Sequence, residues 1–289
     1  MTTETVWTLG ALLDWTVKHL AQKGAESPRV DAEVLLAHVV GCKRIDLYGM
    51  RHQEEASSDV RQSYREQIRK RVEGCPVAYL VGHKEFFSLK LKVSPAVLIP
   101  RPDSELAVVE TLAQIKRHTQ PRVLDLGAGS GNLAIAIAKH HPGAQVTAVD
   151  LSPDALAIAQ ENARTHGVAD RVRFLQGDLF KPLALADRFD AIVSNPPYIT
   201  DDEMKQLPIG VREFEPHLAL RGGPDGFAVL DRILDEARRR LEPGGVLVLE
   251  IGSPQEQAAR AKIAAIPEYD LAPTVFDGSG HPRVLRATA

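Results

Sequence analysis

Four sets of residues have the types and spacing of a ligand-binding site. They are a glycine loop at residues 127–131, Asp150, Asp178 and the tetrapeptide Asn195-Pro196-Pro197-Tyr198. Each set directly follows a short apolar segment of the length of a buried strand. The carboxyl ends of parallel strands meet at one edge of a sheet, and ligands of open α/β sheets bind there. The spacing therefore predicts that all four sets contribute to one site.

The glycine loop is predicted to bind a cofactor. Glycines between a strand and a helix permit a tight turn and let a ligand approach the backbone closely. A dinucleotide fingerprint requires a further glycine at position 132, where this chain has Asn132. The spacing is instead G-x-G-x-G, which resembles the loop of S-adenosylmethionine-dependent methyltransferases. The candidate cofactor-binding residues of the loop are Gly127, Ala128, Gly129, Ser130 and Gly131.

Two acidic residues extend this prediction. Asp150 closes the second apolar segment, where a carboxylate can accept hydrogen bonds from both hydroxyls of a ribose. This role suits nicotinamide and adenosyl cofactors alike. Asp178 can accept from an adenine amino group, and Leu179 can flank the ring. Asp125 is either a third acidic partner or a support for the glycine loop.

The tetrapeptide at 195–198 suits methyl transfer to a planar nitrogen. The lone pair of an amide or exocyclic amine is delocalised, so two hydrogen-bond acceptors must hold its N–H groups and direct the lone pair at a methyl donor. The Asn195 side-chain oxygen and the Pro196 carbonyl can do so, and Pro196 and Pro197 restrict the backbone. Tyr198 offers a flat face to a planar substrate group. Rate then comes from alignment, without a metal. The alternative is a strand terminator without chemistry.

These residues must be positioned by the elements around them. Helical spacing predicts helices at 8–23, 31–40 and 57–73, and alternation predicts a strand at 87–93 that pairs with 97–99 as a hairpin. From residue 121 strands and helices alternate, which predicts a doubly wound, mostly parallel α/β sheet. Its strands are expected at 122–126, 145–150, 172–175, 189–194, 246–251, 274–276 and 283–286, and two of its helices at 133–140 and 153–166, the second with Ser152 as N-cap.

The composition places few limits on function. The chain has 289 residues, 44% of them hydrophobic, and a formal net charge of -3, which argues only weakly against a polyanionic partner. Its two cysteines suggest a reducing compartment. No signal peptide and no membrane-spanning run are expected, so the predicted location is cytoplasmic.

Several longer segments resemble the release factor glutamine methyltransferase family (PrmC, also called HemK). The resemblance extends from about residue 29 to 286. Besides the glycine loop and the NPPY tetrapeptide, it rests on the segments RVDAEVLLAHVVG at 29–41, PVAYL at 76–80, VLIPRPDSE at 97–105, EPHLAL at 215–220, EIGSPQ at 250–255 and GHPRV at 280–284.

The resemblance implies a Rossmann-like methyltransferase domain at 103–289, a β-hairpin linker at 76–102 and a helical domain at 1–75 that helps dock a release factor. The implied reaction is N5-methylation of the glutamine in the Gly-Gly-Gln motif of class 1 peptide chain release factors, with S-adenosyl-L-homocysteine as second product. Asn195 and the Pro196 carbonyl would hold the amide and Asn195 would also face the cofactor, while Pro197 and Tyr198 complete the substrate site. No nucleic-acid partner, membrane or metal is implied.

Several segments are compatible with two interpretations. Ala78 stands where the family more often has Gln, and the pair Asp103-Ser104 where it has Glu-Thr. The basic run at 65–71 is a solvated helix face or a partner surface, and residues 215–217 are a plain connector or a wall of the site. The alternative function is methylation of adenine N6 or guanine N2 in nucleic acid. A nicotinamide dehydrogenase or a non-catalytic cofactor-binding module is the third class.

Overall fold

The computed structural model describes residues 6–289. The expectation that the chain has no signal peptide rests partly on residues 1–5, which lie outside the described residues. The chain divides into two compact units, one formed by residues up to Gly82 with Ile209–Phe214 and the other by the remainder. The three-part division at 75 and 102 stays a prediction. No helix within residues 6–289 is long and apolar enough to cross a membrane.

The smaller unit is a helical bundle, as the apolar spacing predicts. Its helices are α1 (Leu9–Gln22), α2 (Pro28–Val40), α3 (Ser58–Val72), α4 (Val77–Val81) and α8 (Ile209–Arg212), with the 3-10 helices η1 (Arg44–Tyr48) and η2 (Met50–Gln53). Thr8 and Ser57 cap α1 and α3 with their side chains. A core of leucines, including Leu13 and Leu35, surrounds the buried Tyr64.

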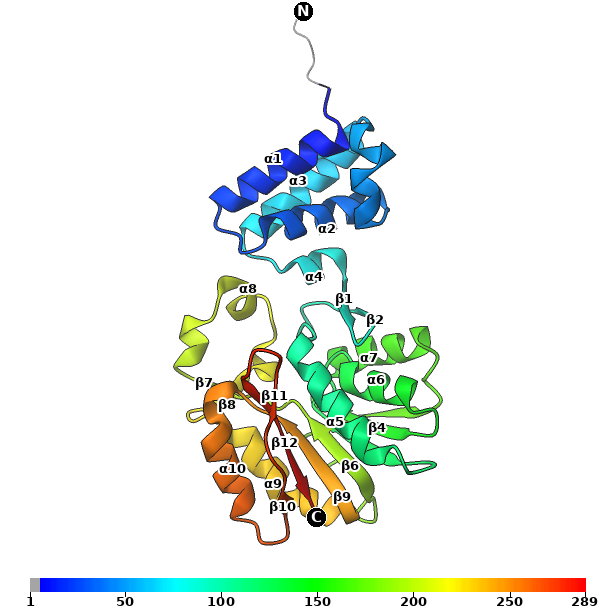
Figure 1. Ribbon diagram of the computed structural model, residues 1–289, viewed down its shortest axis with the longest axis vertical. Helices are drawn as coiled ribbons and strands as arrows, with labels where there is room; N and C mark the ends of the chain where they lie inside the picture. The colour runs from blue at the N-terminus through cyan, green and yellow to red at the C-terminus, as the bar shows by residue number, and fades with distance from the viewer. Residues whose placement is uncertain (1–5) are drawn as a thin grey trace, which may run out of the picture. The chain divides into compact units, whose positions relative to one another are not determined.

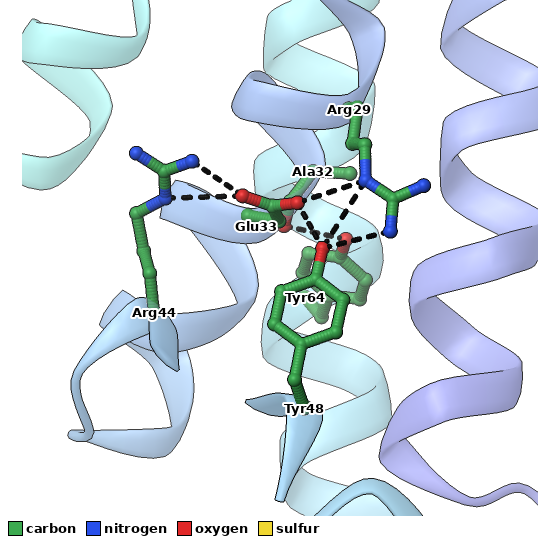
Figure 2. A network of polar contacts seen from close by, with 6 residues as sticks. All are labelled: Arg29, Ala32, Glu33, Arg44, Tyr48 and Tyr64. Carbon is green, nitrogen blue, oxygen red and sulfur yellow. Dashed lines mark hydrogen bonds and ion pairs between the residues drawn. The ribbon is translucent and has the colours of Figure 1, made fainter. Parts of the chain in front are cut away.

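A polar network around Glu33 stabilises this bundle (Figure 2). Glu33 lies on α2 with its side chain only 7% exposed, and it accepts hydrogen bonds from Arg29, Arg44 and the Tyr48 hydroxyl. Burial alone would raise the pKa of Glu33, but the hydrogen bonds from Tyr48 and Arg44 hold it below the ordinary value of 4.5. The ionised carboxylate thus ties α2 to the segment that follows it.

The basic run on α3 is engaged mainly with acidic residues of the same unit. Arg69 pairs with Glu66 and with Glu73, at 2.7 and 2.8 Å. Arg71 reaches across to Asp31 on α2, at 2.8 Å. These pairs agree with the reading of the run as a solvated helix face.

The hairpin lies earlier in the chain than the alternation predicts. Strands β1 (His83–Phe86) and β2 (Leu89–Lys92) pair antiparallel, and Phe87 and Ser88 form the two-residue turn, both with positive φ. Residues 97–99 form no strand, so the predicted 87–93 with 97–99 pairing is wrong. The error arose because the turn residues are Phe and Ser, which continue the alternating pattern instead of interrupting it.

The larger unit is built on a mostly parallel sheet in the order β10-β12-β9-β6-β3-β4-β5, with β11 beside β12 (Figure 1). The strands β9, β6, β3, β4 and β5 run parallel, and β12 is antiparallel to β9. The predicted doubly wound α/β fold with a helical N-terminal bundle is confirmed. The sheet strands are β3 (Arg122–Leu126), β4 (Gln145–Asp150), β5 (Val172–Gln176), β6 (Phe189–Ser194), β9 (Leu241–Glu250), β10 (Asp270–Leu271), β11 (Val275–Phe276) and β12 (Pro282–Thr288).

Helices cover both faces of this sheet, and each face has its own core. Figure 1 shows α5 (Glu105–Ile115), α6 (Asn132–His140) and α7 (Pro153–Thr165) on one face, packed against strand residues such as Val123 and Val193. The helices α9 (Ala228–Arg240) and α10 (Glu256–Ala264) cover the other, against Leu124 and Ile192. Alternate residues of each strand therefore enter opposite cores, which explains the continuous apolar runs. The remaining elements are η3 (Pro102–Ser104), β7 (Ile199–Thr200), η4 (Glu203–Gln206), η5 (His217–Ala219), β8 (Arg221–Gly223) and η6 (Ser253–Gln255).

We predict that Glu33→Gln lowers the free energy of unfolding of the helical unit by about 1–3 kcal/mol at pH 7, because hydrogen bonds to a buried ionised acceptor are lost. The pKa of Glu33 is lower in the folded state than the ordinary value of 4.5 that it has in the unfolded chain. Its stabilising effect is therefore complete above about pH 4.5 and is lost as the pH falls through the lowered folded-state pKa. Urea unfolding followed by circular dichroism at pH 7 measures the difference.

The matched control is Glu66→Gln on α3, whose ion pairs are about half exposed and, being screened by solvent, should contribute much less than the buried Glu33 network. Equal effects of the two substitutions would show that the Glu33 network does not stabilise the bundle.

Candidate active site

A cavity opens at the carboxyl edge of the parallel strands of the larger unit. The register places Leu126 of β3 beside Val149 of β4 on one side and beside Ser194 of β6 on the other. The strand order reverses between β3 and β6, so this is the topological switch point of the sheet. Residues from all four predicted sets line the cavity; they are Gly127, Gly129, Ser130, Asp150, Asp178, Leu179, Asn195, Pro196 and Pro197.

The glycine loop leads from β3 into α6 with all three glycines at positive φ, between 53° and 81°. A Cβ added at Gly127 or Gly129 would meet no atom within 4 Å, so a ligand can approach the backbone there. At Gly131 it would lie 2.8 Å from Ile135, so this glycine serves packing under the loop. Ala128 is buried and belongs to the core on the α6 face of the sheet.

Asp150 binds the glycine loop, and Asp125 binds the helix that follows the loop. Asp150 accepts hydrogen bonds from the backbone N–H groups of Gly129 and Ser152, at 2.7 and 2.9 Å, and lines the cavity. Each of its oxygens keeps a lone pair for a ligand. Asp125 is fully buried and accepts from the N–H of Ala134. Burial raises the pKa of Asp125 to about 7, and the charge of Asp150 contributes. Asp125 does not line the cavity, which favours the reading of this residue as a support over that of an acidic partner.

Asp178 and Leu179 form the next part of the wall. The Asp178 carboxylate pairs with Lys181 at 2.8 Å and with Arg232 at 2.7 Å, and these hydrogen bonds hold its pKa below the usual range. Leu179 has a φ of 52°, a left-handed conformation that side chains rarely adopt. An adenine amino group bound at Asp178, as predicted, would therefore share this carboxylate with Lys181 and Arg232.

The tetrapeptide follows β6 directly. The Asn195 side-chain nitrogen donates to the Ser104 hydroxyl at 3.1 Å, and Asn195, Pro196 and Pro197 line the cavity. Tyr198, the next residue, is not among the residues that line the cavity, and its ring approaches Gly252. Burial and the charge of nearby Glu250 raise the pKa of Tyr198 to about 12, so its hydroxyl stays neutral.

The connection after the tetrapeptide completes the wall. Pro216, Leu218 and Ala219 line the cavity, so the segment from residue 215 is more than a connector. Glu215 anchors it, because its buried carboxylate accepts hydrogen bonds from the Ile99 N–H and from Arg101. This ion pair joins two segments more than a hundred residues apart in sequence.

Sequence reasoning missed a support of the site on α7. The buried Asn162 side chain donates to the carbonyls of Ser130 and Lys92 and accepts from the Lys92 N–H. It thereby connects the glycine loop to β2 of the hairpin. An amide in the middle of an amphipathic helix gives no signal of this role, although its place on the buried face could have drawn attention to it.

Comparison with known proteins decides the family. A family model described as "Methyltransferase domain" matches residues 117–272, and one described as "PrmC N-terminal domain" matches residues 11–82. A release factor glutamine methyltransferase of Rhodopirellula baltica is 44% identical over 98% of this chain and 96% of its own length. The chain belongs to this family. Relatives of the same name from Moorella thermoacetica (43% identical, 97% of this chain and 98% of the relative) and Salmonella typhimurium (44%, 91% and 92%) agree.

Solved structures support the fold. A methyltransferase from Pyrococcus furiosus superposes with a TM-score of 0.52, at 19% identity, over 77% of this chain and 98% of that one. The hMettl16 catalytic domain, solved in complex with MAT2A 3'UTR hairpin 6, gives 0.57 at 16% identity, over 76% and 81%. At this identity the similarity concerns the Rossmann-like fold alone.

Membership of this methyltransferase family implies use of S-adenosylmethionine, and the cavity fits that cofactor. The open space beside Gly127 and Gly129 leaves their backbone accessible. The Ser130 hydroxyl is buried and has no hydrogen-bond partner within residues 6–289, which leaves it available to a ligand.

We predict that Asp150→Ala weakens the binding of S-adenosylhomocysteine about 10- to 100-fold, since hydrogen bonds to a charged acceptor contribute about 1.5–3 kcal/mol. Isothermal titration calorimetry measures the dissociation constant. The matched control is Asp154→Ala, which removes an exposed carboxylate of the next helix that does not line the cavity. An unchanged affinity of the Asp150 variant would contradict the role of this carboxylate.

Proposed function

We propose that this chain methylates the N5 amide nitrogen of the glutamine in the Gly-Gly-Gln motif of class 1 peptide chain release factors, with S-adenosylmethionine as methyl donor. The observation that carries the proposal is the near full-length similarity to release factor glutamine methyltransferases. The cavity supports it, because Asn195 and Pro196 line the same space as the glycine loop.

The chemistry of a glutamine amide explains this arrangement. The amide nitrogen shares its lone pair with the carbonyl and is a poor nucleophile. Two acceptors that bind its two N–H groups hold the amide so that this lone pair, which lies perpendicular to the amide plane, points at the methyl donor. The Asn195 side-chain oxygen and the Pro196 carbonyl are such acceptors, and neither is basic enough to remove a proton. As the N–CH3 bond forms, the bond from the methyl group to the donor sulfur breaks, and the strongly acidic methylated amide then loses one N–H proton to water. The site therefore accelerates the reaction by proximity and orientation.

The cofactor half of the cavity has separate residues. When bound, S-adenosylmethionine supplies an electrophilic methyl group on a sulfonium. We assign its methionine part to the glycine loop, the ribose hydroxyls to Asp150, and the adenine end to Asp178 with Leu179. The remaining lone pairs of Asp150 and the left-handed backbone at Leu179 support this assignment.

The rest of the tetrapeptide serves the same geometry. Pro196 and Pro197 limit the backbone torsions on both sides of the acceptor carbonyl. Tyr198 packs behind them beside Gly252, and its carbonyl accepts a hydrogen bond from Gln255 at 3.2 Å. A contact between the Tyr198 ring and the bound glutamine stays a prediction.

The proposed partners are release factors, and the helical N-terminal unit is proposed to help dock them. Release factors act on ribosomes, so we place the reaction in the cytoplasm, and we assign no step to a metal. A nucleic-acid amino group is the alternative acceptor. Its planar nitrogen has two N–H groups, like a glutamine amide, and could bind Asn195 and Pro196 in the same way. However, the net charge of -3 gives the protein little general attraction to a polyanion.

The test is incubation of the enzyme and S-adenosylmethionine with an unmodified bacterial release factor, with naked DNA and ribosomal RNA as competing acceptors. Peptide mass spectrometry should find one added methyl group on the Gly-Gly-Gln peptide and none on a release factor whose motif glutamine is replaced by alanine. Label that appears only on nucleic acid would contradict the proposal.

The same assay tests Asn195. Asn195→Ala should lose more than ~10-fold in turnover while cofactor affinity changes less than about 3-fold, because this side chain acts mainly on the acceptor. Equal losses of turnover and cofactor affinity would mean that Asn195 belongs to the cofactor site instead.

A further inference from the structure

Glu250 is a buried acid at the site to which neither the chemistry above nor the family comparison assigns a role. It is the last residue of β9 and only 3% exposed. Its Oε2 atom has no hydrogen-bond partner within the described residues 6–289. A buried carboxyl group with an unpaired oxygen lowers the stability of the fold, so a functional reason for its presence is expected.

The strand register places Glu250 next to the catalytic tetrapeptide. Leu249 pairs with Ser194, so Glu250 and Asn195 leave their strands side by side. The Ser104 hydroxyl is 1% exposed and accepts a hydrogen bond from Asn195. It also lies near enough to the Glu250 carboxyl to lower the pKa of that group.

The other charged or titratable groups that face Glu250 are Asp103, Arg283 and Tyr198. Arg283 is engaged elsewhere, with Asp103 at 3.0 Å and Asp277 at 2.9 Å. Glu250 therefore has no dedicated cationic partner among these neighbours. Its near contacts are the hydroxyl of Ser104 and the amide of Asn195.

These contacts determine which end of the Asn195 amide faces the substrate. The oxygen and nitrogen of an amide have nearly the same shape, so only hydrogen bonds distinguish the two orientations. An ionised Glu250 can only accept, so the Ser104 hydroxyl donates to it. The Ser104 oxygen then accepts from the Asn195 nitrogen, as observed at 3.1 Å. The Asn195 oxygen is left as the free acceptor.

We propose that Glu250 and Ser104 are positioning residues, which form a relay of hydrogen bonds that orients the Asn195 side-chain oxygen toward the acceptor nitrogen of the substrate. This inference rests on the proposed function, because only an N–H-bearing substrate requires that orientation. The relay acts through Asn195, and neither residue takes part in bond making.

The relay has a direction that protonation reverses. A protonated Glu250 can donate to Ser104, which can then donate to the Asn195 oxygen and withdraw it from the substrate. The pKa of Glu250 is raised to about 7, mainly by burial. The neighbouring Ser104 hydroxyl lowers this pKa, and the negative charge of Asp103 raises it. Turnover should therefore fall as the pH decreases through about 7.

The kinetic test uses Glu250→Gln and Ser104→Ala, with Ser104→Thr as the variant that keeps the hydroxyl. Turnover of release factor by Glu250→Gln should fall at least ~10-fold at pH 8 and lose its dependence on pH near 7, with cofactor affinity within about 2-fold. Ser104→Ala should behave alike, and Ser104→Thr should recover most of the turnover. The matched control is Glu242→Gln at the other end of β9, which should retain wild-type turnover.

Folding is checked separately. Since the raised pKa means that ionised Glu250 lowers stability as the pH rises through about 7, Glu250→Gln should have a Tm at pH 8 equal to or above that of the wild type. Asp125 also has a pKa of about 7. Its titration should appear in cofactor affinity and persist in Glu250→Gln.

A second readout does not depend on the substrate. The side-chain amide protons of Asn195, followed by NMR in the full chain with bound S-adenosylhomocysteine, should shift with a midpoint near pH 7 in the wild type. They should not shift there in Glu250→Gln. If release factor is not methylated but this titration appears, the proposed function fails and the relay stands. Wild-type turnover with an unchanged pH profile in Glu250→Gln, or no shift of the Asn195 amide, would overturn the relay.

Discussion

The site depends on a constraint of the sheet, namely that parallel strands β3, β4, β5 and β6 all end at one edge. Their registers align the last residues of each strand, so loops distant in sequence emerge side by side. The chain reverses its strand order between β3 and β6. This reversal places the glycine loop after β3 next to the tetrapeptide after β6, which is the juxtaposition that a methyl transfer requires.

Buried and half-buried polar side chains support the loops at this edge. Asp125 and Asp150 bind backbone N–H groups in and after the glycine loop, and Asn162 binds a loop carbonyl from α7. Glu215 anchors the cavity-lining segment that follows it, because its carboxylate accepts hydrogen bonds from the Ile99 N–H and from Arg101. A reaction that relies on alignment gains most from such support, because a small displacement of either half loses the near-attack geometry.

The parts of the site that sequence reasoning recovered are those that lie within one short segment. The glycine loop, Asp150 and the tetrapeptide each follow a strand, and the rule for parallel sheets brings them together. The supports were not recovered, because Ser104, Glu215 and Asn162 act on residues 30 to over 100 positions away. The hairpin was misplaced for a local reason, since Phe87 and Ser88 adopt positive φ without the usual turn residues. Tyr198 packs beside Gly252, and its contact with the substrate stays a prediction.

The central claim is that one cavity holds a methyl donor and a glutamine amide bound by two neutral acceptors. A crystal structure of this chain with S-adenosylhomocysteine and a Gly-Gly-Gln peptide tests it directly. The account predicts the amide nitrogen within about 3 Å of both the Asn195 side-chain oxygen and the Pro196 carbonyl oxygen, with the cofactor sulfur on the side of the glycine loop. A glutamine bound outside this cavity, or held by neither acceptor, would contradict it.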